Sequence, residues 1–388
     1  MCGPDGATVK GYGEDICQGP CHDERNGSFS DDIEEVALAG HENATVKEDD
    51  ADLDEAIRGR HEQLRNELHF LHQRDLRVSP CEDEVGIGVG RPGASYILRL
   101  RARRLLFEQT ESWDESASAL LKTASEGPTT VLNKALLEKI NTICPFASAT
   151  AILDTGCGVA QVLGSLLGTY GVSLPVETRL VAADLSPGMI SVVDARREAE
   201  VSAGNSIWNR VETAIWDAQN LAAVGVPDET FSHITAGLVL FMVERPQDVL
   251  LETHRVLCDG GLFGMTSFRS VQWMDLVGEA LNAIKPGSDL PPIPAAWAST
   301  QSIARQLEDA GFRDVTAEEV KTYYEFEDPE PMTRFNVANI PSVKMVTAEF
   351  SADEVEKAIQ WMLQWLAERF SSGKGKLEGI AIVATARK

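Results

Sequence analysis

The chain has 388 residues, of which 43% are hydrophobic and 24% are charged, and its formal net charge is −25 at pH 7. This composition is typical of a globular protein, and the length allows one large domain with additions or two smaller ones. The acidic balance excludes two classes of partner, because nucleic acids and anionic membrane surfaces attract clustered basic residues. We therefore expect neither a nucleic-acid partner nor a membrane partner.

The cysteines and the opening residues bear on the compartment. Seven cysteines are scattered along the chain and do not form the dense pattern of a disulfide framework. Cys17, Cys21 and His22 lie close together, but no second pair of ligands follows, so we expect no metal site. The opening stretch lacks the basic and apolar segments of a secretion signal. These features predict a cytoplasmic protein.

The first 127 residues differ in composition from the rest of the chain. Residues 1–60 carry sixteen Asp and Glu against five Lys and Arg, and such a segment buries too little apolar surface to offset its ordering entropy. We expect a disordered acidic tail there, and an N-terminal helical lid region over 61–127. Residues 88–93, GVGRPG, match the dinucleotide-binding pattern, but no buried strand precedes them, so they are interpreted as a hinge.

From residue 128 onward, short apolar segments alternate with amphipathic ones. Residues 128–143, 186–204 and 245–261 have helical spacing. Alternating strands and helices predict a parallel sheet with helices on both faces, and such sheets bind ligands beyond the carboxyl ends of their strands. The predicted strands are 149–154, 178–184, 209–217, 231–239, 261–268, 311–320 and 379–388.

The stretch ILDTGCGVA, residues 152–160, runs from the first of these strands into a glycine turn. A dinucleotide site needs a third small residue at position 161, where this chain has Gln161. Asp154 stands two residues before Gly156, and a carboxylate there would repel a pyrophosphate but suit the ammonium group of an amino-acid-bearing cofactor. The turn therefore favours S-adenosylmethionine over NAD.

Two further acids end or follow the next two strands. Asp184 ends the second strand, where an acid accepts hydrogen bonds from both ribose hydroxyls. Asp217 follows the third strand and is placed to accept from an adenine amino group, with Trp216 and Ala218 flanking the ring. A single aspartate at a strand end is often only the N-cap of the next helix. Three of them at successive strand ends form a coherent set.

In the stretches LDTGCGVA, VAADLSPGMI, WDAQNL and HRVLCDGGLFGMTSF the chain resembles the class I S-adenosylmethionine-dependent methyltransferases. The resemblance covers roughly residues 110–320 and the last strand. It implies a Rossmann-like α/β fold, with a seven-stranded, mostly parallel sheet, helices on both faces and N-terminal helices. The methyltransferase domain would span 128–388, with a C-terminal cap insertion over 321–375. Residues 267–277 resemble the fungal small-molecule branch that includes gliotoxin thiol methyltransferases.

The resemblance also implies roles for individual residues. Gly156 and Gly158 would contact the methionyl part of S-adenosylmethionine, and Asp184 would contact the ribose. A tryptophan in an upstream helix, Trp113, would close over the cofactor. The residues implied to bind the cofactor are Trp113, Asp154, Gly156, Cys157, Gly158, Asp184, Leu185, Met189, Trp216, Asp217, Ala218 and Ala236.

Methyl transfer needs a nucleophile held in line with the methyl group at about 3 Å. A thiol nucleophile would need less help than a hydroxyl. No general base stands out, because His233 starts a predicted buried strand and His254 lies within a helix, so the catalytic residues are unknown. A surface salt bridge would explain Arg269 as well as a substrate contact would. The residues expected to surround the methyl position and bind substrate are Phe241, Met242, Phe268, Arg269 and Trp273.

Residues 351–370 within the insertion have helical spacing, and Ser351 with Glu354 predicts a capping box at the start. We expect the apolar stripe of this helix to pack against the sheet. Trp361 and Trp365 lie one turn apart and would be able to line a pocket instead. The stripe consists of Val355, Ile359, Met362, Leu366 and Phe370.

These observations favour an S-adenosylmethionine-dependent methyltransferase that acts on a small organic molecule in specialised metabolism, by O-, S- or N-methylation. Two alternatives stay open. The same fold would serve a non-methylating cyclisation or rearrangement, and a regulatory binding protein would use the acidic tail to recruit a partner. The sequence does not identify the substrate, the accepting atom or the oligomeric state.

Overall fold

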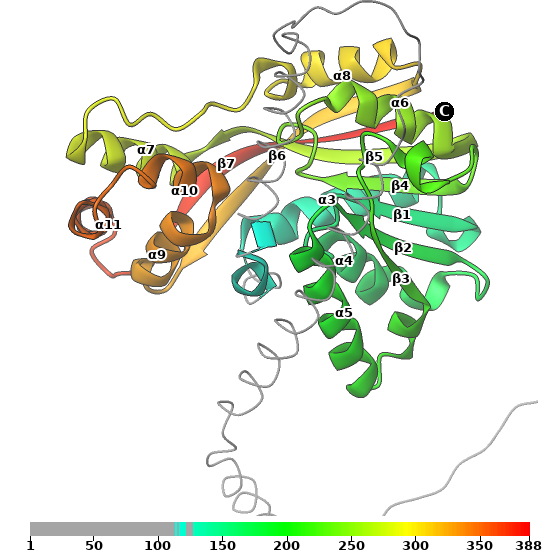
Figure 1. Ribbon diagram of the computed structural model, residues 1–388, viewed down its shortest axis with the longest axis horizontal. Helices are drawn as coiled ribbons and strands as arrows, with labels where there is room; N and C mark the ends of the chain where they lie inside the picture. Colours follow the sequence, from blue (N-terminus) through cyan, green and yellow to red (C-terminus); the bar gives the residue numbers. More distant parts are fainter. Residues whose placement is uncertain (1–112, 115, 122–126) are drawn as a thin grey trace, which may run out of the picture. The chain divides into compact units, whose positions relative to one another are not determined.

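The computed structural model describes residues 113, 114, 116–121 and 127–388. Its strands are β1 (Ala151–Thr155), β2 (Arg179–Asp184), β3 (Val211–Ile215), β4 (Phe231–Gly237), β5 (Leu257–Val271), β6 (Arg313–Phe326) and β7 (Gly375–Arg387). They form one sheet in the order β3-β2-β1-β4-β5-β7-β6 (Figure 1). Strands β1 to β5 are parallel, and β7 runs antiparallel to both of its neighbours. The expected α/β fold class is confirmed.

Helices connect most of these strands. The α-helices are α3 (Pro128–Ile143), α4 (Gln161–Tyr170), α5 (Pro187–Ser202), α6 (Pro246–Val256), α7 (Gln272–Ile284), α8 (Thr300–Asp309), α9 (Pro329–Asn339), α10 (Pro341–Thr347) and α11 (Ala352–Arg369). Short 3₁₀ helices are η1 (Phe146–Ser148), η2 (Gly171–Ser173), η3 (Ser206–Arg210), η4 (Leu221–Val224) and η5 (Ala295–Trp297). Helices α3, α5 and α6 begin at Pro128, Pro187 and Pro246, because the fixed φ of proline suits the first helical turn.

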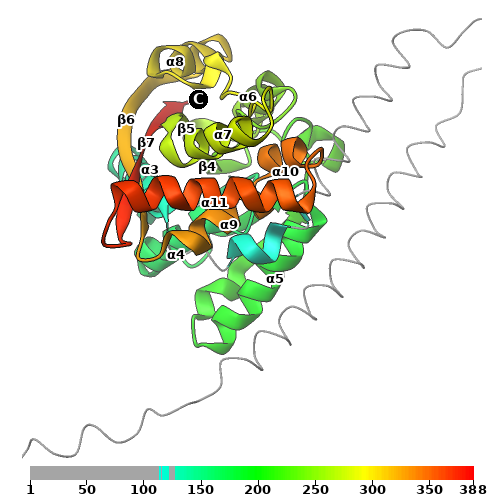
Figure 2. The ribbon, with the colours of Figure 1, turned by 90° about the vertical axis from the view of Figure 1, so that its left-hand side faces the viewer.

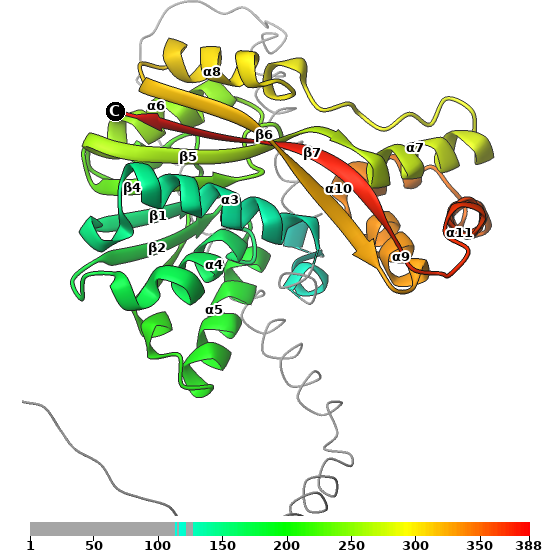
Figure 3. The ribbon, with the colours of Figure 1, turned by 180° about the vertical axis from the view of Figure 1, so that it is seen from behind.

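Both faces of the central sheet are buried. Neighbouring residues of a strand point to opposite faces. Ile152 packs in a cluster with residues of α3, α4 and α5, whereas Leu153 packs in a second cluster with residues of α6 and α8. Figure 3 shows α3 crossing the near face of the sheet. Because both faces are buried, the central strands consist mostly of apolar residues and do not alternate between apolar and polar ones.

Strands β5 and β6 are longer than predicted, and they carry a cap region that consists of α7 and α9–α11 (Figures 1 and 2). Helix α7 follows β5 directly, so this region lies beyond the carboxyl end of a parallel strand. The expected insertion over 321–375 begins later than predicted, because β6 continues to Phe326 by pairing with β7. The inserted helices α9, α10 and α11 lie between β6 and β7.

Helix α11 has the predicted capping box, in which Ser351 accepts from the backbone of Glu354 and the Glu354 side chain accepts from the backbone of Ser351. We expected the apolar stripe of α11 to pack against the sheet, but its main partners are two helices. The stripe lies chiefly against α7 and α9, in a cluster to which the strand ends contribute Val271, Phe326 and Leu377. Trp361 and Trp365 are partly buried against the same cluster. The long strands hold the cap region out from the parallel part of the sheet, so the helix finds its apolar partners there.

Several expectations fall outside the described residues. They are the acidic tail over 1–60, the cysteine and histidine stretch from Cys17 to His22, the hinge over 88–93 and most of the lid region over 61–127. Among the residues that the structure does describe, no helix combines the length and apolar character of a membrane span.

Candidate active site

The loop between β1 and α4 turns sharply because three of its residues have positive φ angles. Gly156 and Gly158 have φ of 60° and 54°, and Ala160 has φ of 56°. Glycine adopts this region freely, whereas an alanine there costs roughly 1–2 kcal/mol. At Gly156 a Cβ atom would lie 2.6 Å from a methyl group of Val239, but at Gly158 no such neighbour lies within 4 Å. The loop packs tightly at Gly156 and leaves open space beside Gly158.

Asp184, the last residue of β2, joins this loop to the start of α5. Its Oδ2 accepts a hydrogen bond from the N–H of Gly158 at 2.9 Å, and its Oδ1 accepts from the N–H of Ser186 at 2.9 Å. Burial raises the pKa of this carboxyl above its ordinary value, and the nearby charge of Asp114 adds to the rise. A carboxylate oxygen accepts two hydrogen bonds. Asp184 therefore retains capacity for donors of a ligand.

Asp154 lies beneath the loop with only 1% of its surface exposed. Its Oδ1 accepts from the hydroxyl of Thr235 at 2.7 Å, and its Oδ2 accepts from the N–H of Leu163 at 3.2 Å. Burial raises its pKa to about 7 in spite of these two bonds. The carboxyl thus ties β1 to β4 and to the first turn of α4. Its interaction with a cofactor ammonium group stays a prediction.

Hydrogen bonds to the carboxylate of Asp217 stabilise the loop after β3. Asp217 Oδ1 accepts from the N–H of Gln219 at 2.9 Å and from the Gln219 side-chain amide at 3.0 Å. The Gln219 amide oxygen in turn accepts from the N–H of Arg245 at 2.9 Å, which ties this loop to the loop after β4. Trp216 and Ala218 pack at the edge of the core cluster that contains α6. Their role in flanking an adenine stays a prediction.

The other residues implied to bind a cofactor lie near these strand ends, and they differ in how far their side chains are buried. Met189, in the first turn of α5, is buried in a small cluster against which Trp113 packs. Leu185 is partly exposed between β2 and α5. Cys157 is buried in the glycine loop, and burial raises the pKa of its thiol well above the ordinary value. Ala236 is fully buried within β4. None of these roles is tested by the geometry alone.

Asp114 is a residue of this site that the sequence analysis missed. Its Oδ1 accepts from the hydroxyl of Ser186 at 2.5 Å and from the N–H of Gly188 at 2.8 Å. Ser186 is the N-cap of α5, and its Oγ accepts from the N–H of Met189 at 3.0 Å. The proton of that hydroxyl goes to a residue 72 positions upstream. A side chain so distant in sequence leaves no local signal.

The residues expected to bind substrate fall into two groups. Phe241 and Met242 lie in the loop after β4, where Phe241 packs at the edge of a core cluster and Met242 is 40% exposed. Phe268, within β5, and Trp273, in α7, belong to the cluster of the cap region, and their ring centroids are 5.9 Å apart. Arg269 lies within β5, and its guanidinium pairs with Glu319 of β6 at 2.6 Å. The aromatic pair therefore belongs to the cap region and the methionine to the loop.

Comparisons with known proteins agree with this geometry. Residues 153–265, which include the glycine loop and all three aspartates, match a family model described as a methyltransferase domain. The methyltransferase ucsB of Acremonium sp. is 28% identical over 278 residues, covering 71% of this chain and 93% of that protein. The methyltransferase ktnA of Aspergillus niger is 26% identical over 271 residues, covering 61% and 84%. Residues 153–265 therefore carry a methyltransferase domain, and most of the chain is similar to fungal methyltransferases.

Solved structures similar to this methyltransferase include the cyclase SpnF, with 20% identity, a TM-score of 0.39 and coverage of 66% of this chain and 80% of that chain. Another is the Haemonchus contortus phosphoethanolamine N-methyltransferase 2, solved in complex with S-adenosyl-L-methionine. It has 15% identity and a TM-score of 0.38, and the match covers 66% of this chain and 52% of that chain.

The two histidines that the structure describes are held away from the strand ends of this methyltransferase. His233 is fully buried near the amino end of β4, and its ring contacts the hydroxyl of Ser232 and the carbonyl of Cys144 at 2.9 and 3.0 Å. Burial lowers its pKa. His254 in α6 packs edge-on against Phe312, and burial lowers its pKa as well. Within the described part of the chain, no three His, Cys, Asp or Glu side chains gather to hold a metal ion.

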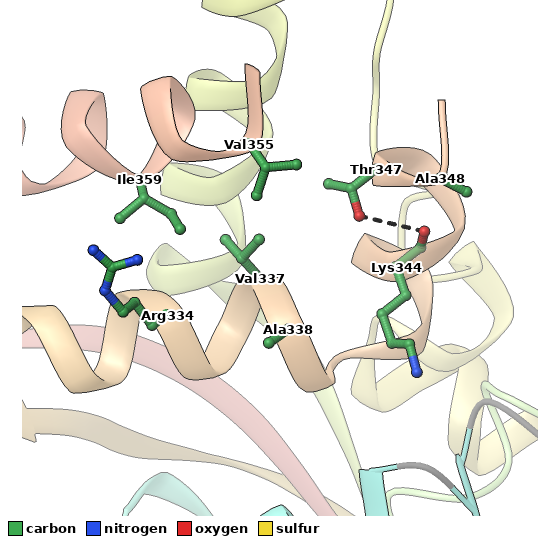
Figure 4. Close-up of a pocket in the computed structure, with 8 residues that line it drawn as sticks. All are labelled: Arg334, Val337, Ala338, Lys344, Thr347, Ala348, Val355 and Ile359. Carbon is green, nitrogen blue, oxygen red and sulfur yellow. Dashed lines mark hydrogen bonds between the residues drawn. The ribbon is translucent and has the colours of Figure 1, made fainter. Parts of the chain in front are cut away.

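The cap region contains a cavity of about 490 Å³ between α9, α10 and α11 (Figure 4). Most of its wall is apolar, and the guanidinium of Arg334 is paired with Glu330 and Glu356. Its lining comes from these helices and from Ala348, which directly follows α10, and none comes from the loops that follow β1, β2 or β3. The lining residues are Arg334, Val337, Ala338, Lys344, Thr347, Ala348, Val355 and Ile359.

Proposed function

We propose that this methyltransferase uses S-adenosylmethionine to methylate a small organic molecule in specialised metabolism, at an oxygen, sulfur or nitrogen atom. The observation that carries the proposal is the contact of Asp184 with the N–H of Gly158, beside open space at that glycine. This contact puts a carboxylate beside open space that a ligand would be able to occupy, and a Cβ atom at position 158 would project into that space.

The residues present fit the cofactor. Each oxygen of Asp184 holds one backbone N–H and has capacity for another donor, which suits the two adjacent hydroxyls of a ribose. Two carboxyls, the buried one of Asp154 and the partly buried one of Asp184, suit a ligand that carries positive charge and oppose a pyrophosphate. Gln161 begins α4 in place of the small residue that a dinucleotide needs. These features favour S-adenosylmethionine over NAD.

When bound, S-adenosylmethionine supplies a methyl group on a positively charged sulfur. The protein's own contribution is then to orient the cofactor and to hold the accepting atom in line with that methyl group. Asp184 and the glycine loop would fix the nucleoside end. The loop after β4, with Met242 exposed, and the aromatic residues of the cap region would enclose an organic substrate and exclude water.

A small-molecule substrate is favoured over a macromolecule. The net charge of −25 opposes nucleic acid. The region beyond the carboxyl end of β5 is rich in aromatic and apolar side chains, which suits an organic compound. The fungal relatives ucsB and ktnA support a methyltransferase of fungal metabolism.

Calorimetric titration with S-adenosylmethionine and, separately, with NAD tests the cofactor. We expect the wild type to bind S-adenosylmethionine only, and Asp184→Ala to bind it at least about tenfold more weakly, since a hydrogen bond to a charged group contributes roughly 1.5–3 kcal/mol. Asp194→Ala is the matched control, because Asp194 is a buried carboxylate of α5 whose partners include Thr213 and Arg197. Binding by neither ligand would contradict the proposal.

A second measurement separates methyl transfer from the non-methylating alternative. Candidate substrates are incubated with the protein and S-adenosylmethionine, and S-adenosylhomocysteine is quantified. Its formation in step with a product heavier by one methylene unit would establish methylation. A converted substrate without S-adenosylhomocysteine would establish a cyclisation or rearrangement instead.

A further inference from the structure

The segment of residues 113, 114 and 116–121, called the upstream segment below, is attached to the candidate active site by one carboxylate. Asp114 Oδ1 accepts from the Ser186 hydroxyl at 2.5 Å and from the Gly188 N–H at 2.8 Å. Only 9% of the Asp114 surface is exposed, and Ser186 is 2% exposed. Hydrogen bonds to a carboxylate are short and strong, and burial strengthens them further.

Ser186 connects this carboxylate to the one proposed to hold the ribose. The Ser186 N–H donates to Asp184 Oδ1 at 2.9 Å, while the Ser186 hydroxyl donates to Asp114 and accepts from the N–H of Met189. One residue is therefore fixed from two sides. If Asp114 were removed, the hydroxyl would lose its acceptor, and the turn that carries the Asp184 contact would lose a restraint.

The packing around Gly188 makes the attachment close. A Cβ atom at Gly188 would lie 2.7 Å from the Cα atom of Asp114, so the backbone of the upstream segment lies directly on the first turn of α5. Ala117 of the segment is buried with Met189 and Val192 of α5. Apolar contact and hydrogen bonding thus hold the segment at the same end of the helix.

We propose that Asp114 is a positioning residue, which orients Asp184 through Ser186 and so couples docking of the upstream segment to binding of S-adenosylmethionine. The inference rests on the proposed function. Two carboxylates near one another also repel, and the charge of Asp114 acts on Asp184. A positively charged ligand at Asp184 relieves that repulsion, and the docked segment favours the ligand in return.

Calorimetric titration with S-adenosylmethionine tests the coupling. Asp114→Ala is expected to raise Kd about tenfold, the effect of losing a charge-assisted hydrogen bond of about 1.4 kcal/mol. Asp114→Asn keeps an oxygen acceptor and is expected to recover most of the affinity. Ser186→Ala is expected to weaken binding as much as Asp114→Ala, and the double variant no more than either, because the two side chains act as one unit.

The matched control is Ser351→Ala, which removes the N-cap of α11 in the cap region. Its melting temperature is expected to fall as that of Asp114→Ala falls, while its affinity stays at the wild-type value. A purely structural role for Asp114 would lower stability without changing affinity. If Asp114→Ala does not fold, Asp114→Asn and Ser186→Ala carry the comparison.

Hydrogen exchange detected by mass spectrometry gives a second readout. Addition of S-adenosylmethionine is expected to slow exchange of the amides over 116–121 in the wild type, and to have little effect there in Asp114→Ala. Wild-type affinity in Asp114→Ala, or unchanged exchange in the wild type at saturating ligand, overturns the coupling. If the wild type itself binds no S-adenosylmethionine, the proposed function fails, and this inference fails with it.

Discussion

The carboxylate of Asp184 accepts a hydrogen bond from the backbone N–H of Gly158, a residue 26 positions earlier in the chain. The bond joins the carboxyl end of β2 to the loop after β1, and these two strands lie side by side in the sheet. The loop has glycine at two positions with different surroundings, because Gly156 packs against Val239 whereas Gly158 faces open space.

Gly156→Ala and Gly158→Ala are expected to act differently. Both place alanine at a positive φ, which costs roughly 1–2 kcal/mol. Only Gly156→Ala also drives a methyl group against Val239, so its total loss of stability is expected to be roughly 2–5 kcal/mol. Gly158→Ala fills the space proposed for the cofactor, and we expect it to lose affinity for S-adenosylmethionine more than stability.

Urea unfolding and calorimetry of the two variants check this pair. Val239→Ala is the matching second substitution, because it removes the methyl groups that the new Cβ would meet. The double variant Gly156→Ala/Val239→Ala is expected to be less destabilised than the sum of its single changes. Equal loss of stability in both glycine variants would contradict the difference in packing.

The parts of this site that the sequence could predict depend on neighbours along the chain. Ser186 and Pro187 start a helix by local rules, and the placement of Asp184 at a strand end follows from the apolar run before it. The buried role of Asp154 could not be predicted, because its partner Thr235 lies 81 residues away on β4. Only the register of β1 on β4 places these two residues opposite one another.

The ends of β5 show the same limit. The apolar pattern predicted a strand over 261–268, but the strand continues to Val271 because Ser270 and Val271 pair with Ile380 and Gly379 of β7. Strand ends are set by hydrogen-bonding partners, and these partners are more than a hundred residues away. The longer strands displaced the cap region outward, and this is why the partners of α11 were predicted wrongly.

Gly188→Ala and Gly168→Ala form a second pair of predictions, since both glycines are helical. At Gly188 the added methyl group would meet the backbone of Asp114, whereas at Gly168 it would meet nothing within 4 Å. We expect Gly168→Ala to stabilise the protein by up to about 1 kcal/mol, the difference in helix propensity. Gly188→Ala is expected to destabilise it and to expose the upstream segment to limited proteolysis near residue 121. Equal proteolysis rates in the two variants would contradict this reading of the contact.

The contribution of Asp154 to the stability of the ligand-free protein is expected to fall as pH rises from about 4 to about 7. The pKa of Asp154 is about 7 in the folded chain against 3.8 for an ordinary aspartate, so between these values the folded state holds a proton that the unfolded state has lost. The loss is up to about 1.4 kcal/mol for each pH unit, and it stops above pH 7. Urea unfolding from pH 5.5 to 8 checks it. Asp154→Asn is expected to flatten the slope, and the exposed Asp309→Asn is expected to leave it unchanged.

Binding of S-adenosylmethionine is expected to release protons at pH 6.5. Burial raises the pKa of Asp154 to about 7 in the ligand-free protein, so a fraction of this carboxyl is protonated at that pH, and burial also raises the pKa of the neighbouring Asp184. A positively charged ligand favours the ionised form of a nearby carboxyl, and the proton is then lost to the buffer. Calorimetry in two buffers of different ionisation enthalpy counts the protons released.

S-adenosylhomocysteine provides the comparison for this prediction, because it lacks the charge on sulfur but keeps the nucleoside and the amino acid. We expect it to release fewer protons than S-adenosylmethionine, and Asp154→Asn to release fewer with either ligand. Linkage requires the affinity for S-adenosylmethionine to rise with pH over the range in which protons are released. Proton uptake, or the same proton count for both ligands, would show that the sulfur charge does not act on these two carboxyls.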